Sequence, residues 1–221
     1  MRPVDKGTAP KNYNQYKEAR NDLGKQIGWY CSYCEMPITN MIEVEHIVPR
    51  NNGGDPLSWD NLLLSCKYCN TIKGARNPSR NGYIWPDKDN SDLAFDYSET
   101  AGIGVLNANI QIEALNTIEL MGLDRNPGFP NEPTDADSRW IFRLQAWLIA
   151  KKSLENWNCK STPEMANQIA LTAKGSGFYS IWIKIFSGEP EVITAIRDSF
   201  DGTYYSLDIN GNRIIRQNAI I

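Results

Sequence analysis

The chain has 221 residues, of which 41% are hydrophobic and 10% aromatic, and its net charge is −3. This composition can fill a core and excludes an intrinsically disordered chain. No apolar run approaches the length of about 18 residues that crosses a bilayer, and the opening MRPVDKGTAP lacks the apolar segment of a secretion signal. We therefore expect a cytoplasmic protein with no membrane partner.

Charge is distributed unevenly along the chain. Residues 1–80 contain 11 Lys/Arg and 8 Asp/Glu, whereas residues 81–221 contain 12 and 18, and residues 61–86 contain no acidic residue. A polyanion is attracted to the first part and repelled by the second. The predicted nucleic-acid contacts are the four basic residues of the acid-free segment: Lys67, Lys73, Arg76 and Arg80.

The first part of the chain predicts a helix, two short strands and a second helix. Apolar residues at near-helical spacing predict the first helix over 11–28. A β-rich run predicts a strand over 41–48 that ends at Pro49, because proline cannot donate to a sheet ladder. The Gly-rich loop at 51–56, a strand at 62–64 and a helix at 69–75 follow.

The second part of the chain is predicted to be mostly helical. Helices are expected over 105–123, 138–157, 163–175 and 189–200, after a connecting region at 78–104 that holds a short hairpin. The helix at 138–157 carries an apolar stripe that predicts a core face: Trp140, Ile141, Leu144, Trp147, Leu148 and Leu154.

Three details of this second part carry their own predictions. Ser161 and Glu164 form a capping box, with Pro163 in the first turn. Residues 178–186 fit a strand, because their isoleucines alternate, or a helix, because of their position in the chain. Asn210-Gly211 between apolar runs predicts a hairpin over 204–215.

Two CxxC pairs frame the stretch that carries the chemistry. The four thiolates of Cys31, Cys34, Cys66 and Cys69 match a closed tetrahedral zinc site, which is structural and not catalytic. The 31 residues between the pairs are too few to fold alone, so zinc would close them into a stable loop. The fifth cysteine, Cys159, is expected to be a partly buried thiol.

The zinc loop encloses His46, which is the only histidine of the chain. His46 lies at a strand end after Glu45 and before Pro49. Asn61 follows 15 residues later, and Asn70 comes directly after the last cysteine of the second pair. A neutral imidazole can take a proton from water near pH 7, so this grouping indicates acid–base chemistry.

The segment EHIVPR…NNGG…DNLLLSCKYCNTIKG resembles the HNH endonucleases, whose fold is a ββα-metal finger. The resemblance implies that His46 is the general base, that Asn61 braces the hairpin and that Asn70 binds a catalytic metal. Glu45 stands where many members place a metal-binding Asp, and Lys73 where a basic residue often contacts phosphate. Strict alternation along a strand would point Glu45 away from His46.

Two departures from the commonest family pattern affect the choice of metal. The third motif position is Asn70 instead of histidine, and the carboxylate is Glu45 instead of aspartate. Oxygen ligands favour Mg²⁺ or Mn²⁺ over softer transition metals. We therefore expect two metals, a structural Zn²⁺ and a catalytic Mg²⁺ or Mn²⁺.

The opening MRPVDKG and the segments IGWYCSYCEMPI and IEVEHIVPR are similar to the PtuB family, the HNH subunits of the Septu anti-phage systems. This resemblance implies a nuclease effector that works with a PtuA-type ATPase of the ABC/SMC class, with DNA as the default substrate. A zinc-stabilised binding or scaffold subunit without catalysis, and a standalone restriction-type HNH nuclease, remain as alternatives.

The predicted fold class is α+β, with a zinc-stapled ββα finger set in a mostly helical chain that ends in a β-hairpin. If the chain divides, residues 1–95 are the nuclease module and residues 96–221 are a helical, partner-docking region. The acidic charge of that second region favours a protein partner over nucleic acid.

Overall fold

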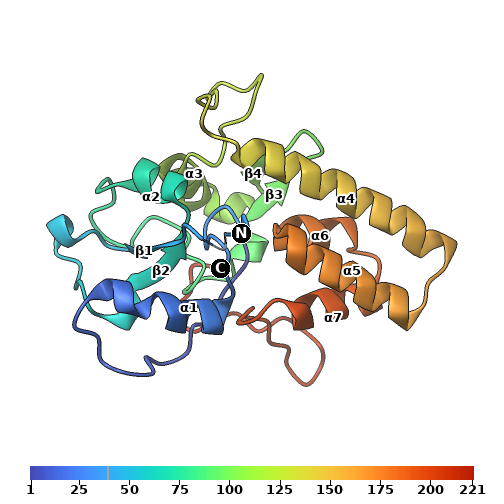
Figure 1. Ribbon diagram of the computed structural model, residues 1–221, viewed down its shortest axis with the longest axis horizontal. Helices are drawn as coiled ribbons and strands as arrows, with labels where there is room; N and C mark the ends of the chain where they lie inside the picture. Colours follow the sequence, from blue (N-terminus) through green and yellow to red (C-terminus); the bar gives the residue numbers. More distant parts are fainter. Residues whose placement is uncertain (39) are drawn as a thin grey trace.

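The computed structural model describes residues 1–38 and 40–221, and within them it confirms a mixed α and β fold with small antiparallel hairpins. Figure 1 shows two groups of elements on either side of the chain ends, with β1, β2, α1 and α2 on one side and α4 to α7 on the other. None of the described helices is long and apolar enough to cross a membrane.

The first group contains the predicted finger. It comprises the short helix η1 (Tyr16–Ala19), α1 (Arg20–Ile27), β1 (Glu43–His46), β2 (Leu62–Ser65) and α2 (Lys67–Lys73). The two strands pair antiparallel, with Glu43 opposite Ser65 and His46 opposite Leu62. Every residue of β2 is buried, so β2 is the inner strand of this hairpin, whereas β1 is fully buried only at its two central residues. The short helices η2 (Arg50–Asn52) and η3 (Trp59–Asn61) shape the loop between the strands.

The predicted helix at 11–28 is shorter in the structure. Regular α-helix begins only at Arg20, after one 3-10 turn. Tyr13 is buried, stacks on Trp59 with ring centroids 6.0 Å apart, and donates its hydroxyl to Asp22. These contacts hold residues 11–15 outside the helix, so tertiary packing overrides the local helical pattern.

A second hairpin joins the finger to the helices. It pairs β3 (Phe95–Tyr97) with β4 (Ile103–Val105), and the short helix η4 (Ser91–Leu93) precedes it. The predicted helix at 105–123 therefore starts later, with η5 (Ala108–Ile110) and α3 (Gln111–Met121). The Asn107 side chain caps η5 by accepting from the Asn109 amide.

The helical group consists of α4 (Arg139–Cys159), α5 (Pro163–Ser176), α6 (Tyr179–Ile185) and α7 (Pro190–Ser199). The cap of α5 is Thr162, which accepts from the Met165 amide, so the predicted capping box at Ser161 is wrong by one residue. Ser161 instead donates to Trp157 O at the end of α4. The ambiguous segment at 178–186 is helical.

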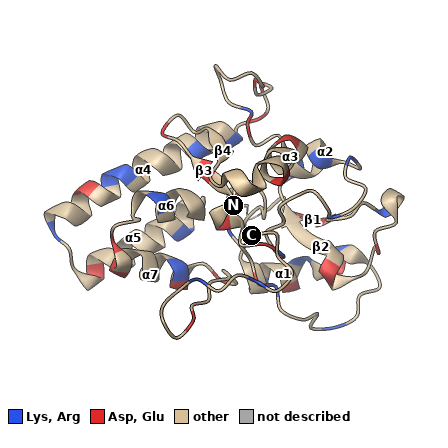
Figure 2. Ribbon diagram, turned by 180° about the vertical axis from the view of Figure 1, so that it is seen from behind, with Lys and Arg blue, Asp and Glu red and all other residues tan. Residues whose placement is uncertain are grey.

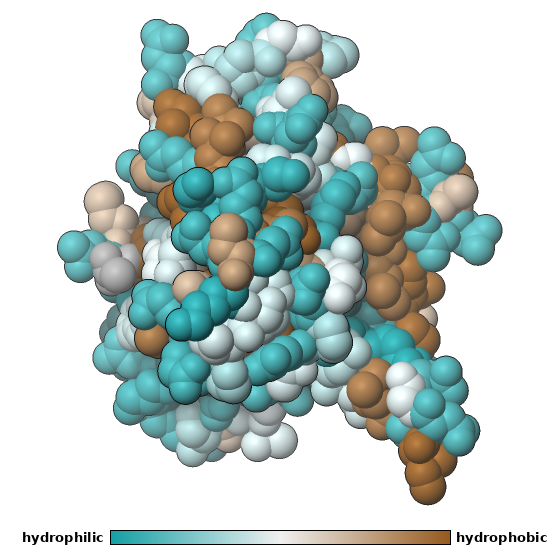
Figure 3. Space-filling view, turned by 90° about the vertical axis from the view of Figure 1, so that its right-hand side faces the viewer, coloured by the Kyte–Doolittle hydropathy of each residue, from teal (hydrophilic) through white to brown (hydrophobic). Residues whose placement is uncertain are grey.

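The apolar stripe predicted for α4 is only partly buried. The buried residues of this helix are Arg139, Arg143, Ala146, Ala150 and Trp157. Ile141 and Leu148 are exposed, so the expectation of a core stripe is wrong for them. Figure 3 shows apolar side chains reaching the surface in separate patches at this end of the molecule.

The chain ends run between the two groups of elements. Arg2 donates to Asp201 O and Thr203, and Lys6 donates to Trp59 O and Leu62 O. The predicted hairpin at 204–215 consists of one bridge between Leu207 and Arg213, without regular strands. Figure 2 shows acidic and basic residues interspersed along the helices.

Candidate functional site

Four cysteines converge at the junction of the finger and the helices. The Sγ atoms of Cys31, Cys34, Cys66 and Cys69 all lie within 4.8 Å of one another, and all four residues are buried. Tetrahedral zinc with bonds of about 2.3 Å separates its sulfurs by about 3.8 Å. The Cys34–Cys66 separation of 3.8 Å agrees with that geometry. The predicted cysteine cluster is therefore confirmed as a group that can hold zinc.

The chemistry of the four thiols also fits a bound cation. Hydrogen bonds from the other sulfurs and burial hold the pKa of Cys66 well above its ordinary value. Burial opposes ionisation of Cys31 too, but hydrogen bonds from its three neighbours hold its pKa well below the usual range. The surroundings thus favour the thiolate of Cys31 and oppose that of Cys66. A divalent cation removes this conflict, because coordinated thiols ionise.

Arg139 connects this cluster to the helical group. It is 2% exposed, and its Nη1 donates to Cys69 Sγ at 3.1 Å and to Met121 O at 2.9 Å. Asp137 binds the same guanidinium at 2.7 Å. Burial disfavours its charge, but hydrogen bonds with Asp137 and the charges of the sulfurs raise the pKa of Arg139. A buried cation here would offset the negative charge of four thiolates that hold a zinc ion.

Cys159 takes no part in the cluster. It ends α4, far along the chain from both CxxC pairs, and it is exposed instead of partly buried as predicted. The helix end that carries it faces solvent.

His46 lies at the end of β1, where Tyr16 and Pro56 hold its imidazole. The Nε2 atom lies 3.1 Å from Pro56 O. Because a carbonyl oxygen only accepts, Nε2 carries the hydrogen and Nδ1 remains as the basic nitrogen. The Tyr16 ring packs against the imidazole with centroids 4.7 Å apart. Burial, together with the charges of Arg50 and Lys73, lowers the pKa of His46, so the ring is neutral near pH 7.

Asn61 lies where a brace of the hairpin is required. Its Oδ1 accepts from the Val48 amide at 2.8 Å, and its Nδ2 donates to Val48 O and Asp55 O. These bonds fix the loop that ends in Pro56, whose carbonyl orients His46. Gly54 permits the tight approach, since a Cβ there would lie 1.9 Å from Val48 O.

Asn70 reaches the site from α2. Its Nδ2 donates to Glu43 Oε2 at 2.7 Å, which leaves Oδ1 as an available acceptor. Helix α2 begins directly after β2, and Cys66 caps it by accepting from the Cys69 amide. The zinc cluster therefore fixes the start of the helix that carries Asn70.

Glu45 lies deeper and is 2% exposed. The Tyr33 hydroxyl donates to Glu45 Oε1, and Lys73 Nζ lies 3.1 Å from Oε2. Burial raises the pKa of Glu45 to about 7, although Lys73 opposes the shift. Lys73 also donates to His46 O at 2.7 Å. Lys73 is itself 1% exposed, so it is a partner of Glu45 inside the fold. The prediction that Lys73 contacts phosphate at the surface is therefore wrong.

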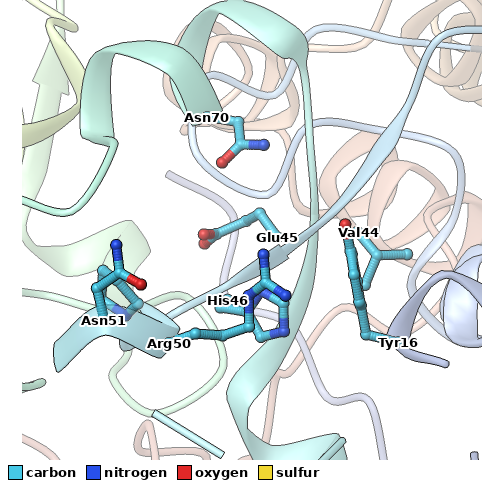
Figure 4. A pocket seen from close by; sticks show the side chains of 8 residues that line it. Tyr16, Val44, Glu45, His46, Arg50, Asn51 and Asn70 are labelled. Carbon is cyan, nitrogen blue, oxygen red and sulfur yellow. The ribbon is translucent and has the colours of Figure 1, made fainter. Parts of the chain in front are cut away.

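A cavity of about 230 Å³ brings these groups together. Figure 4 shows Asn70 on one side, Arg50 and Asn51 on another, and Glu45 with His46 between them. Glu45 and His46 both line this cavity, so alternation along β1 does not separate them. A second cavity, of about 290 Å³, shares Tyr16, Val44 and Asn70 with the first. We call the two adjoining cavities the trough.

The trough contains oxygen donors that fit a hard divalent ion. Glu45 Oε2 is buried without a hydrogen-bond partner among the described residues, apart from its ion pair with Lys73. Asn70 Oδ1 is its neighbour across the cavity. Carboxylate and amide oxygens are ligands that Mg²⁺ and Mn²⁺ accept.

The other predicted nucleic-acid contacts have different surroundings. Arg76 is exposed but donates to Glu119 O and Leu120 O at the end of α3. Arg80 is paired with Asp87 at 2.9 Å. Lys67 is exposed, one turn before Asn70 on α2. Lys67 lines another cavity, with Tyr68, Thr71 and Arg125, so none of the four predicted residues lines the trough.

Sequence reasoning missed four residues that shape the site: Tyr16, Tyr33, Glu43 and Arg50. Glu43 carried a usable signal, because it lies two residues before Glu45 on the same strand. Tyr16 carried none, since its contact with His46 crosses from a separate element. Tyr33 lies between the two cysteines of a CxxC pair, which indicates a structural role. Its bond to Glu45 was therefore not predicted.

Comparison with known proteins agrees with this geometry. The HNH endonuclease family model matches residues 31–76. The chain is 36% identical over 63 residues to Septu protein PtuB of Bacillus thuringiensis, a stretch that covers 27% of this chain and 24% of that protein. The similarity therefore spans about a quarter of the relative's length. No solved structure matches the chain. The match to the HNH endonuclease family is thus confined to residues 31–76 of this chain.

Proposed function

We propose that this chain is a metal-dependent endonuclease that hydrolyses phosphodiester bonds of nucleic acid, with DNA as the default substrate. The observation that carries the proposal is the state of His46. Its Nε2 is held on Pro56 O and its pKa is lowered, which leaves a neutral ring with Nδ1 available in an open cavity. A non-catalytic binding module does not require such a base.

Each residue of the proposed active site has one task. His46 Nδ1 takes a proton from the attacking water, while Asn61 keeps the loop and hence Pro56 in place. Glu45 and Asn70 would hold Mg²⁺ or Mn²⁺, which polarises the phosphate and stabilises the leaving oxygen when bound. Lys73 lies inside the fold, and its ion pair with Glu45 holds that carboxylate at the wall of the cavity.

The four cysteines have a separate task in this proposal. They would hold Zn²⁺, which closes the loop between the two CxxC pairs and fixes the start of α2. The active site therefore needs two ions, a structural one that is enclosed and a catalytic one that exchanges.

A plasmid-nicking assay with Mg²⁺ or Mn²⁺ tests the proposal. We expect the wild-type chain to nick, and His46→Ala to lower the rate by about 10²–10⁴-fold. The control is Cys159→Ser, an exposed position outside the site, which should cut like the wild type. Cleavage by His46→Ala at the wild-type rate would reject His46 as the base. Tight DNA binding without any metal-dependent cleavage would favour the zinc-stabilised binding module instead.

We also propose that the chain is the effector subunit of a Septu-like anti-phage complex with a PtuA-type ATPase. The similarity to a Septu protein supports this, and so does the apolar surface of α4, where Ile141, Phe142, Leu148 and Ile149 are each at least 38% exposed. Co-purification with an ATPase encoded beside this chain would support the complex. Full defence by this chain in the absence of that neighbour would favour a standalone restriction-type nuclease.

A further inference from the structure

Three basic side chains line the trough without an acidic partner. Among residues 1–38 and 40–221, Lys17, Arg20 and Arg50 form no ion pair with any carboxylate. Lys17 and Arg20 line one of its two cavities and Arg50 lines the other. By contrast, Arg80 is paired with Asp87 at 2.9 Å. The trough therefore keeps a net positive charge, because its three unpaired cations outnumber Glu43, the one lining carboxylate that forms no ion pair among the described residues.

The three cations lie in the cavity of the proposed base and in the adjoining one. The two cavities share Tyr16, Val44 and Asn70, so they form one continuous depression with Arg50 toward one end and Lys17 with Arg20 toward the other. His46 lies in the cavity that contains Arg50 (Figure 4). A chain of regularly spaced anions laid along the trough would meet Arg50 in the cavity of the base and Lys17 and Arg20 in the adjoining cavity.

Tyr16 holds two of these cations beside the base. The Arg50 guanidinium lies 5.6 Å from the centroid of the Tyr16 ring, and Lys17 Nζ lies 6.0 Å from it. Both distances allow a cation–π interaction, which restricts a side chain that would otherwise move freely in solvent. The same ring packs on His46. One aromatic side chain thus links the base to the positive rim.

Arg20 offers an unsatisfied donor. Its Nε atom is buried and has no hydrogen-bond partner among the described residues. Arg20 as a whole is half-buried, and the accessible part of a guanidinium that forms no ion pair can bind a phosphate oxygen with good geometry. Glu43 is the one acidic residue lining that cavity, and it is already bound to Asn70.

We propose that Lys17, Arg20 and Arg50 bind the backbone phosphates that flank the scissile phosphodiester, and that Tyr16 is a positioning residue for Arg50 and His46. The inference rests on the proposed function and specifies how the substrate is held. Lys17, Arg20 and Tyr16 lie before residue 31, so the segment upstream of the HNH match contributes two of the three phosphate-binding residues and the positioning residue.

The salt dependence of binding tests this assignment. His46→Ala provides a background that binds without cutting, and a short labelled duplex DNA is the probe. Each lost phosphate contact lowers the slope of log K against log salt by about 0.9. We expect Lys17→Ala, Arg20→Ala and Arg50→Ala together to lower it by about 2 to 3. Three exposed lysines far from the trough, changed to alanine together, provide a control with the same net charge: Lys151, Lys152 and Lys160.

The role of Tyr16 requires a separate comparison. Tyr16→Phe retains the ring and should cut like the wild type. Tyr16→Ala should lower both kcat and DNA affinity with an unchanged melting temperature, because it frees His46 and Arg50 together. If Tyr16→Phe is as defective as Tyr16→Ala, or if Tyr16→Ala cuts normally, the ring does not position these groups.

Two further outcomes separate this inference from the nuclease assignment. If the wild-type chain cuts plasmid but the trough variant has an unchanged slope, or the control variant loses as much, the trough assignment is wrong and the nuclease remains. If the wild-type chain neither binds nor cuts nucleic acid, both proposals are wrong.

Discussion

The cysteine cluster and the trough lie a few residues apart in the sequence but differ in every physical respect. The cysteines are at most 3% exposed, provide only sulfur, and are covered by Arg139 from α4. His46 and Asn70 are half-buried, provide nitrogen and oxygen, and line an open cavity. An enclosed ion becomes part of the fold, whereas an open site lets an ion and a substrate exchange.

The two regions nevertheless touch through one side chain. Tyr33 lies inside the first CxxC loop, and its hydroxyl donates to Glu45 Oε1. The loop that would hold zinc therefore also fixes the carboxylate that would hold the catalytic metal. Variants of the cysteine cluster and variants of the trough can therefore each test whether the first region has a structural task and the second a catalytic one.

The largest expected effect comes from opening the cluster. Cys31→Ser should abolish zinc binding and unfold the finger, because structural zinc contributes about 10 kcal/mol or more to small domains. This contribution is comparable to the whole stability of a typical domain, which is about 5–15 kcal/mol. Zinc content and thermal melting measure the outcome, with Cys159→Ser as the control. A zinc-free variant that melts like the wild type would remove the structural task from the cluster.

A smaller loss is expected when the cover of the cluster is removed. Arg139→Met leaves Asp137 buried without its partner, and breaking a buried ion pair costs about 3–5 kcal/mol. Urea unfolding measures this loss. The exposed Lys151→Met on the same helix should change stability by less than about 0.5 kcal/mol. Equal stabilities of the two variants would show that Arg139 contributes nothing to the cluster.

Removal of the Tyr33–Glu45 contact between the two regions should lower stability by less than the loss of Arg139 does. Tyr33→Phe removes a hydrogen bond to a buried carboxylate, which is worth about 1.5–3 kcal/mol. We expect a lower melting temperature and a higher Mg²⁺ concentration for half-maximal cleavage. Tyr83→Phe is the control, since the Tyr83 hydroxyl has no hydrogen-bond partner among the described residues. A change in stability without a change in metal dependence would mean that the two regions are independent.

The smallest effect concerns the acidic limb of the cleavage profile. A general base works when neutral, and burial lowers the pKa of His46 below its ordinary 6.5. The profile is measured at saturating Mg²⁺, because a bound ion keeps Glu45 ionised although burial raises the pKa of that carboxyl to about 7. Under that condition the midpoint of the acidic limb should lie below pH 6.5. Arg50→Ala removes a charge that lowers this pKa, so its limb should move to higher pH. A wild-type limb above 6.5, or no shift in Arg50→Ala, contradicts the assignment.

The parts of the molecule that sequence predicted well depend on local spacing. The cysteine pairs, His46 and Asn61 are recognisable from their order along a short hairpin. In the structure the four cysteine sulfurs lie together, and Asn61 separately braces the loop whose Pro56 carbonyl contacts His46. The helices at α4, α5 and α7 also follow from local periodicity and caps.

The parts that sequence missed depend on contacts between distant elements. Tyr13 leaves the first helix to stack on Trp59, and Lys73 turns inward because Glu45 is buried beside it. On α4, Arg139 and Arg143 occupy the buried face, since Asp137, Cys69 and backbone carbonyls satisfy their charge. The large apolar residues of that helix are displaced toward solvent. No local pattern signals such an exchange.

The most direct test of the separation between the two regions is a chelation experiment on one preparation. EDTA at a concentration that leaves the bound zinc in place should abolish plasmid nicking, with no change in zinc content or melting temperature. Added Mg²⁺ or Mn²⁺ should then restore cleavage. Cleavage that survives chelation, or that disappears only when zinc is lost and the chain unfolds, would contradict the account of an enclosed structural ion beside an exchangeable catalytic one.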